Sequence, residues 1–269
     1  MSALYEGCWH KLDRAKHHLD ELDSRVGAWA NLHSEPPFTF GKEFNRKRNF
    51  FSFHVESVEA LPVEWSLIAG DVLTNFRAAL DYLAHDLVGA GRESHLKGGT
   101  VPQFAIGRTH RVFRQKVKDR MRGIKPTHRT IIEGYQPYKW RSRRDIHPFA
   151  LLDTLVVRDK HRELQPLATQ NVKSFGAHVI FRNDFFISRL AEGRVFGRGR
   201  KKRLIPRFEP GAEVARVYGK KTGPDPDVEM DFYGPVTIVF KDAPALFPDA
   251  LVGMGQAITK LFREIEPVL

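Results

Sequence analysis

The stretch GDVLTNFRAALDYLAHDL, residues 70–87, combines the pattern of a buried helix with a series of polar side chains. Apolar residues recur through it, and just before it, at steps of three and four, which is the spacing of one face of an α-helix. The members of this face are Trp65, Ile68, Val72, Leu73, Phe76, Leu80, Leu83 and Leu87. We therefore predict a long helix that begins near Pro62 and packs this face into the core.

The polar residues of this helix form a second pattern. Arg77, Asp81 and His85 are four residues apart, so each lies next to the following one on the helix surface. An arginine fork can hold a phosphate, and a carboxylate beside a histidine raises the basicity of its ring. The pattern fits a charged face, or an Arg–Asp pair that orients the helix. It also fits a metal-independent acid–base site that acts on phosphodiesters.

The segments on either side predict further helices and a hairpin. Residues 4–33 have apolar side chains at helical spacing, and the prolines of SEPPF (34–38) end that helix. The alternating runs FTFGKEF and FFSFHVESV flank the basic NRKRN and predict a β-hairpin. Another helix is expected to begin at Pro148. Residues 108–125 predict an amphipathic helix whose apolar face consists of Val112, Phe113, Val117 and Met121.

Short alternating runs replace the helical pattern from about residue 175, and they predict antiparallel strands. Helices grouped early and strands grouped late favour the α+β class. We expect one domain over residues 1–269. Long antiparallel helices and the hairpin would form the mainly helical part (1–168), an antiparallel sheet the strand-rich part (175–245), and a helix at 248–265 would pack back on them.

Positive charge is concentrated in three segments. Residues 108–125, 139–145 and 192–221 carry +7, +3 and +7, which together exceed the net charge of +11 for the whole chain. Such clustering is typical of a protein that binds a polyanion, although a solvated surface would also explain it. Tyr138 and Trp140 lie among these cations and could stack on unpaired bases. The predicted nucleic-acid-binding residues are Arg111, Arg114, Lys118, Arg122, Arg141, Arg143, Arg198, Arg200, Lys201, Lys202 and Arg203.

The segment RDKHRE (158–163) directly follows an apolar helical turn. Its cations suit the negative end of a helix dipole, and Asp159 with His161 could alternatively act as an acid–base pair. No nucleotide-binding or metal-binding motif is present, so we expect no cofactor and no metal site. The single cysteine, Cys8, favours a reducing cytoplasm. We find no secretory signal and no run of apolar residues long enough to span a membrane.

The segments GDVLTNFRAALDYL and HPFALLDTLVVRDKHREL resemble a widespread group of uncharacterised bacterial and phage proteins. That group shares a G-D-x-L-x-N-x-R-x-A-L-D helix and a later D-K-H-R segment, and the resemblance covers most of residues 1–168. An arginine followed by a histidine on one long helix is also distantly similar to HEPN ribonucleases. Their signature has four to six residues between the two, whereas seven separate Arg77 from His85 here.

These patterns lead to three functional hypotheses. The first is a cytoplasmic nucleic-acid-binding protein that prefers RNA to DNA. The second, which the HEPN resemblance implies, is a metal-independent endoribonuclease that uses Arg77, Asp81 and His85, with His161. The third is a protein-interaction module whose basic faces meet an acidic protein partner. A homodimer is compatible with each of these hypotheses, and none of them involves a membrane.

Overall fold

The computed structural model describes residues 6–32, 37–48, 50–89, 101–140, 144–160, 166–170, 176–180, 210–218, 229–233, 236–240, 246–247 and 249–268. Helices and antiparallel strands are both present, which confirms the predicted α+β class. The chain divides into two compact units. One contains Met1–Ala28, Pro62–Pro166 and Phe240–Leu269, and the other contains Trp29–Leu61 and Leu167–Val239. The prediction of a single domain stays a prediction.

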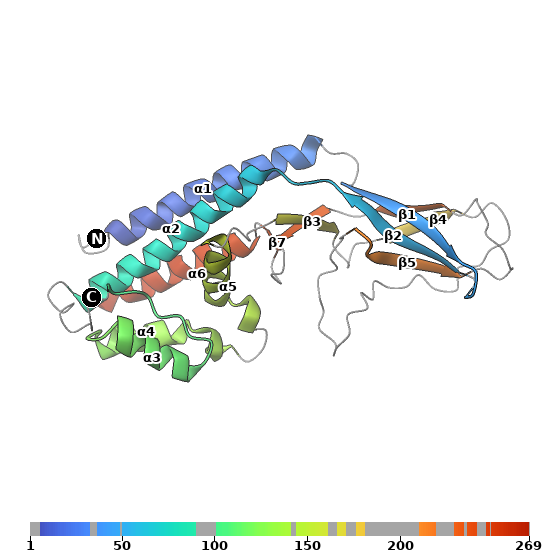
Figure 1. Ribbon diagram of the computed structural model, residues 1–269. Coiled ribbons are helices and arrows are strands. Elements are labelled where there is room, and N and C mark those ends of the chain that lie inside the picture. The colour runs from blue at the N-terminus through green and yellow to red at the C-terminus, as the bar shows by residue number, and fades with distance from the viewer. Residues whose placement is uncertain are drawn as a thin grey trace. The chain divides into compact units, whose positions relative to one another are not determined.

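Helix α2 (Val63–Val88) is the centre of the first unit. All eight residues of its predicted apolar face are buried, and Phe76 and Leu80 have no exposed surface. Helix α1 (Glu6–Leu32) runs beside it in the opposite direction (Figure 1). Helices α5 (Pro148–Lys160) and α6 (Asp249–Ile265) also pack against α2. At Gly255 of α6, a Cβ atom would lie 3.1 Å from Cζ of Phe76, so the missing side chain lets the two helices approach closely.

Helices α3 (His110–Arg120) and α4 (Pro126–Gly134) complete this unit. Phe113, Val117 and Met121 are buried as predicted. Val112 is 41% exposed, so the prediction that it belongs to the apolar face was wrong. The other three residues are four apart and already form a complete stripe, and Val112 lies to one side of it. Helix α4 was not predicted, although its start is marked by a proline in the first turn, where the missing N–H costs nothing.

The second unit contains the predicted hairpin. Strands β1 (Phe38–Asn45) and β2 (Phe50–Val58) pair in antiparallel fashion, and β5 (Glu213–Tyr218) pairs with the other edge of β2. Alternate residues of β2, among them Phe51, Phe53 and Val55, are buried.

The later strands of the chain do not form one common sheet among the residues that the structure describes. Strand β5 joins the hairpin, and β4 (Gly176–Ile180) pairs with β6 (Glu229–Tyr233). A third sheet has the order β3 (Pro166–Gln170), β7 (Val236–Phe240) and β8 (Leu246–Phe247). The alternating pattern of the sequence therefore predicted that strands are present in this region. It did not predict that β5 pairs with the free edge of β2. In the described part of the chain, no helix is both long enough and apolar enough to cross a membrane.

Candidate functional site

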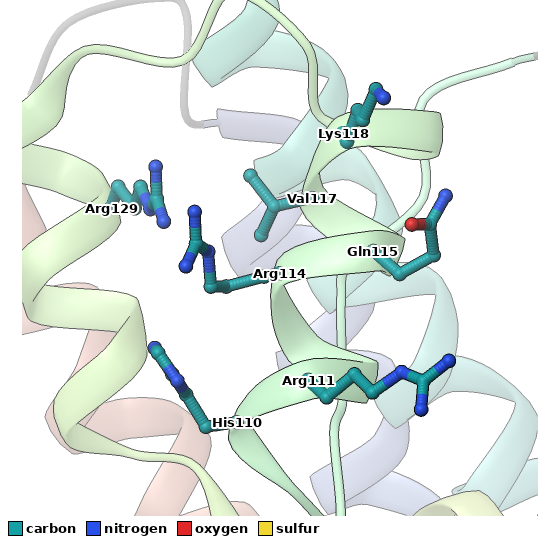
Figure 2. A pocket seen from close by; sticks show the side chains of 7 residues that line it. All are labelled: His110, Arg111, Arg114, Gln115, Val117, Lys118 and Arg129. Carbon is teal, nitrogen blue, oxygen red and sulfur yellow. The ribbon is translucent and has the colours of Figure 1, made fainter.

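A cavity of about 470 Å³ lies between α3 and α4 (Figure 2). Its lining contains four permanent cations, and no carboxylate is among the described residues that form its wall. The lining residues are His110, Arg111, Arg114, Gln115, Val117, Lys118 and Arg129. We call this site the α3–α4 cavity. It brings together three of the basic residues predicted from the sequence and adds Arg129 from α4.

The spacing of the cations on α3 explains why they gather on one side. Arg111, Arg114 and Lys118 follow one another at steps of three and four, so they share a helix face. Phe113 and Val117 turn the apolar side of the helix into the core, which leaves the cationic face toward α4 and solvent. The first turn of α3 contains no acidic residue. Cations near this positive end of the helix dipole lower helix stability, whereas a bound anion there would raise it.

The four cations of the cavity have no acidic partner within the described ranges. Arg111, Arg114, Lys118 and Arg129 form no ion pair with a carboxylate there. Neighbouring cations differ in this respect, because Nζ of Lys116 lies 4.0 Å from Oδ2 of Asp153. The cavity therefore carries a positive charge that the described part of the fold does not neutralise.

Two acidic residues next to the cavity, Asp119 and Glu133, are engaged by groups other than these cations. Both carboxylate oxygens of Asp119 accept from Nε2 of Gln115 over 2.9 Å, and Glu133 has three neighbours. Oε1 of Glu133 accepts a hydrogen bond of 2.8 Å from the hydroxyl of Tyr138 and lies 3.4 Å from Nζ of Lys139. It also lies 3.7 Å from Nε2 of His110. The hydrogen bond from Tyr138, together with Lys139, lowers the pKa of Glu133. Tyr138 is thus part of the fold. Trp140 is 43% exposed, and its ring contacts the ring of His147 with centroids 4.6 Å apart.

The other predicted nucleic-acid-binding residues are not placed at this site. Arg122 follows the end of α3 and does not line the cavity. The remaining ones lie outside the described residues: Arg141, Arg143, Arg198, Arg200, Lys201, Lys202 and Arg203. Arg129 was missed because α4 was missed, although it lies three residues after the proline that begins this helix.

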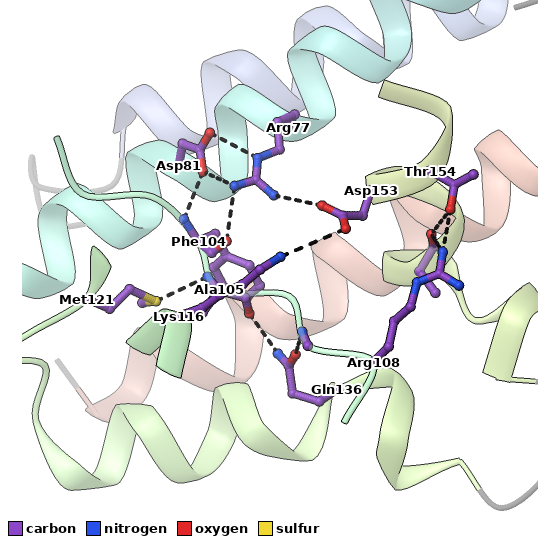
Figure 3. Close-up of polar contacts among 12 residues, drawn as sticks. Arg77, Asp81, Phe104, Ala105, Arg108, Lys116, Met121, Gln136, Asp153 and Thr154 are labelled. Carbon is purple, nitrogen blue, oxygen red and sulfur yellow. Dashed lines mark hydrogen bonds and ion pairs between the residues drawn. The ribbon is translucent and has the colours of Figure 1, made fainter. Parts of the chain in front are cut away.

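Arg77 and Asp81 form a pair that holds an irregular segment, residues 101–107, of which residues 104–107 are buried (Figure 3). Nε of Arg77 donates to Oδ2 of Asp81 over 3.1 Å, and Nη2 lies 2.9 Å from Oδ1. The same Nη2 donates to the backbone oxygen of Phe104 over 3.0 Å. The amide of Phe104 in turn donates to Oδ1 of Asp81 over 2.8 Å. The two side chains thus satisfy both backbone polar groups of a residue that is 1% exposed.

The same segment is held from its other side by residues after α2. Gln136 accepts a hydrogen bond from the amide of Gly107 over 2.8 Å and donates to the oxygen of Ala105 over 3.1 Å. The amide of Ala105 contacts Sδ of Met121 at 3.4 Å. The backbone groups of Phe104, Ala105 and Gly107 are therefore held by hydrogen bonds to side chains, as a buried irregular segment requires.

His85 has a carboxylate partner next to it in the chain. Its side chain is 48% exposed, and Nδ1 lies 3.7 Å from Oδ1 of Asp86. Asp86 also contacts the thiol of Cys8 on α1, whose Sγ lies 3.6 Å from Oδ2. Burial raises the pKa of both Cys8 and Asp86, so this thiol is not an activated nucleophile.

The two segments of the sequence pattern meet where α2 contacts the end of α5. A Cβ atom on Gly70 would lie 2.5 Å from Oδ1 of Asp159, so only glycine leaves room for this carboxylate. Burial, with a smaller contribution from Asp71, raises the pKa of Asp159. The predicted partner of Asp159, His161, lies outside the described residues. Within the ranges that the structure describes, no group of His, Cys, Asp and Glu could hold a metal ion.

Comparison of the chain with models of known protein families, with curated proteins and with solved structures finds no match. The functional interpretation therefore depends on the geometry of the chain itself.

Proposed function

We propose that this protein binds nucleic acid, with RNA preferred to DNA, and that the α3–α4 cavity contacts the phosphate backbone. One observation carries the proposal: four cations from two helices line one cavity without an acidic partner in the described structure. Clustered Lys and Arg that no carboxylate neutralises are the electrostatic feature of nucleic-acid-binding surfaces. The acidic protein partner remains the competing hypothesis for the same charge.

The dimensions of α3 suit more than one phosphate. Arg111 and Lys118 are seven residues apart, which corresponds to about 10 Å along a helix that rises about 1.5 Å per residue. Three cations over this length can contact successive phosphates of one strand. Trp140 supports the preference for RNA, because exposed aromatic rings stack on the unpaired bases that are common in RNA loops. The single cysteine favours a reducing compartment, and a cytoplasmic location is part of this proposal.

The geometry favours a structural role for Arg77 and Asp81 over the ribonuclease hypothesis. The Arg77 guanidinium is already engaged by Asp81 and by the oxygen of Phe104, so its donors are not directed at a substrate. The ring of His85 contacts Asp86. Nucleic-acid binding without cleavage is therefore our leading proposal.

The salt dependence of RNA binding tests the proposal. The affinity for a fluorescent single-stranded RNA is measured at several salt concentrations, and each phosphate contact contributes about −0.7 to the log–log slope. The triple variant Arg111→Gln/Arg114→Gln/Lys118→Gln should flatten the slope by up to about 2. A matched control, Lys16→Gln/Arg25→Gln/Lys260→Gln, removes the same charge from α1 and α6 and should leave the slope unchanged. No binding, or equal losses in both triple variants, would reject the α3–α4 cavity as the site.

A further inference from the structure

Two guanidinium groups in the α3–α4 cavity face each other. Figure 2 shows the side chains of Arg114, from α3, and Arg129, from α4, directed toward one another across the cavity, while Arg111 points away. Both arginines line the cavity, and no carboxylate of the described structure lies between them. Like charges that face each other repel, so this arrangement favours an anion that accepts hydrogen bonds from both sides.

The kind of phosphate that fits between two arginines differs from the kind that lies along a groove. A backbone phosphodiester has two terminal oxygens and one negative charge, and its two ester bonds continue the strand in both directions. A phosphate monoester has three terminal oxygens and a charge between about −1.5 and −2 at pH 7. It can therefore accept hydrogen bonds from two arginine forks at once while only one ester bond leads away from the site.

From this geometry we infer that Arg114 and Arg129 bind the terminal phosphate monoester of an RNA strand. The inference depends on the proposed function and names the part of the RNA that the cavity selects. Arg111 and Lys118 lie about one helical turn to either side of Arg114 on α3, and Arg111 points away from the Arg114–Arg129 pair (Figure 2), so these two cations are left for the phosphodiesters that follow the end. A cavity of about 470 Å³ also lies within the size range of sites that enclose a small ligand group.

The test compares one single-stranded RNA sequence in three forms, with a 5′-phosphate, with a 3′-phosphate, or with hydroxyl groups at both ends. We expect the parent protein to bind one of the phosphorylated forms at least about 10-fold more tightly than the unphosphorylated form, the scale of a charge-assisted hydrogen bond. The preferred form identifies which end is bound. A 5′-mononucleotide and inorganic phosphate are added as competitors, and both should displace the RNA only at much higher concentrations.

Variants of the two arginines assign the preference to the cavity. Arg114→Gln and Arg129→Gln should each abolish most of the preference, and Arg129→Lys should reduce it because lysine keeps the charge but lacks the fork. Arg111→Gln serves as the matched control and should weaken binding of all three RNAs equally, so that their ratio is preserved. Because Arg114 is exposed and Arg129 only partly buried, all four variants are expected to keep the parent's circular dichroism spectrum and melting temperature.

Three results would overturn the inference. They are equal affinity for the three RNAs, a preference that survives both glutamine variants, and displacement by the mononucleotide or phosphate at concentrations similar to those of the RNA. Salt-dependent binding of all three RNAs with equal affinity would reject end recognition while leaving the proposed nucleic-acid binding in place. The absence of binding to any of them would reject both.

Discussion

The Arg77–Asp81 pair predicts a large loss of stability when one partner is removed. Replacing Asp81 by Ala leaves the buried amide of Phe104 without its acceptor and removes the closer carboxylate of Arg77, whose Nη1 still lies 3.9 Å from Oδ1 of Asp153. Breaking one side of a fully buried pair costs about 3–5 kcal/mol. The side chains of Arg77 and Asp81 are 20% and 27% exposed, so water partly replaces the lost contacts, and we expect a loss of about 2–4 kcal/mol.

Thermal and urea unfolding measure this effect. A loss of that size should lower the melting temperature by roughly 5–15 °C in a chain of this length. Asp81→Asn keeps an oxygen for the amide of Phe104 and should lose about half as much stability. The control, Asp20→Ala, alters an exposed position of α1 and should change the unfolding free energy by less than about 0.5 kcal/mol.

The same variants separate the structural role from catalysis. If Arg77→Ala and Asp81→Ala proteins melted at the parent temperature, the proposed support of residues 101–107 would be refuted. If the parent also cleaved single-stranded RNA in EDTA, and Arg77→Ala and His85→Ala lost that activity by about 100-fold, the ribonuclease hypothesis would replace our proposal.

Two further predictions concern His147, directly before α5, and Gly70 of α2. His147 is 4% exposed, its Nδ1 accepts from the amide of Phe149, and burial lowers its pKa to about 4. The unfolded chain takes up a proton on His147 near pH 6.5, whereas the folded chain does so only near pH 4. The free energy of unfolding should therefore fall as the pH drops between these values, by up to about 1.4 kcal/mol per pH unit. The variant His147→Asn, which keeps an acceptor, should remove this part of the pH dependence in urea titrations. Gly70→Ala should lower the melting temperature because its Cβ would lie 2.5 Å from Oδ1 of Asp159. Adding Asp159→Ala should restore much of the lost stability. A double variant that is no more stable than Gly70→Ala would contradict this contact.

Sequence periodicity predicted the eight large apolar residues of α2 that are buried, because their spacing reports directly which side of the helix packs into the core. Val112 shows where this reasoning fails. Three other residues already form the buried stripe of the short helix α3, and periodicity does not say which apolar residue of the segment stays exposed. The pairing of β5 with β2 depends on which strand edge is free, a property of the assembled sheet that alternation within one strand does not contain.

The candidate site was predictable in part for similar reasons. Arg111, Arg114 and Lys118 are grouped by helical spacing alone, whereas Arg129 reaches the cavity only because α4 packs beside α3. His85 was grouped with Arg77 and Asp81 by its spacing, but Asp86 beside it in the chain and the 101–107 segment beside Asp81 gave the three residues different partners.

The support of residues 101–107 by side chains has a consequence for the order of folding. A strand or helix satisfies its backbone groups within one regular element, but this segment needs Asp81 of α2, Met121 after α3 and Gln136 after α4 at the same time. It cannot gain these hydrogen bonds until all three parts of the chain have assembled, so we expect its ordering to come late and to be cooperative. The segment also leads directly into α3. The cationic face of that helix therefore reaches its final position only when the surrounding core is complete.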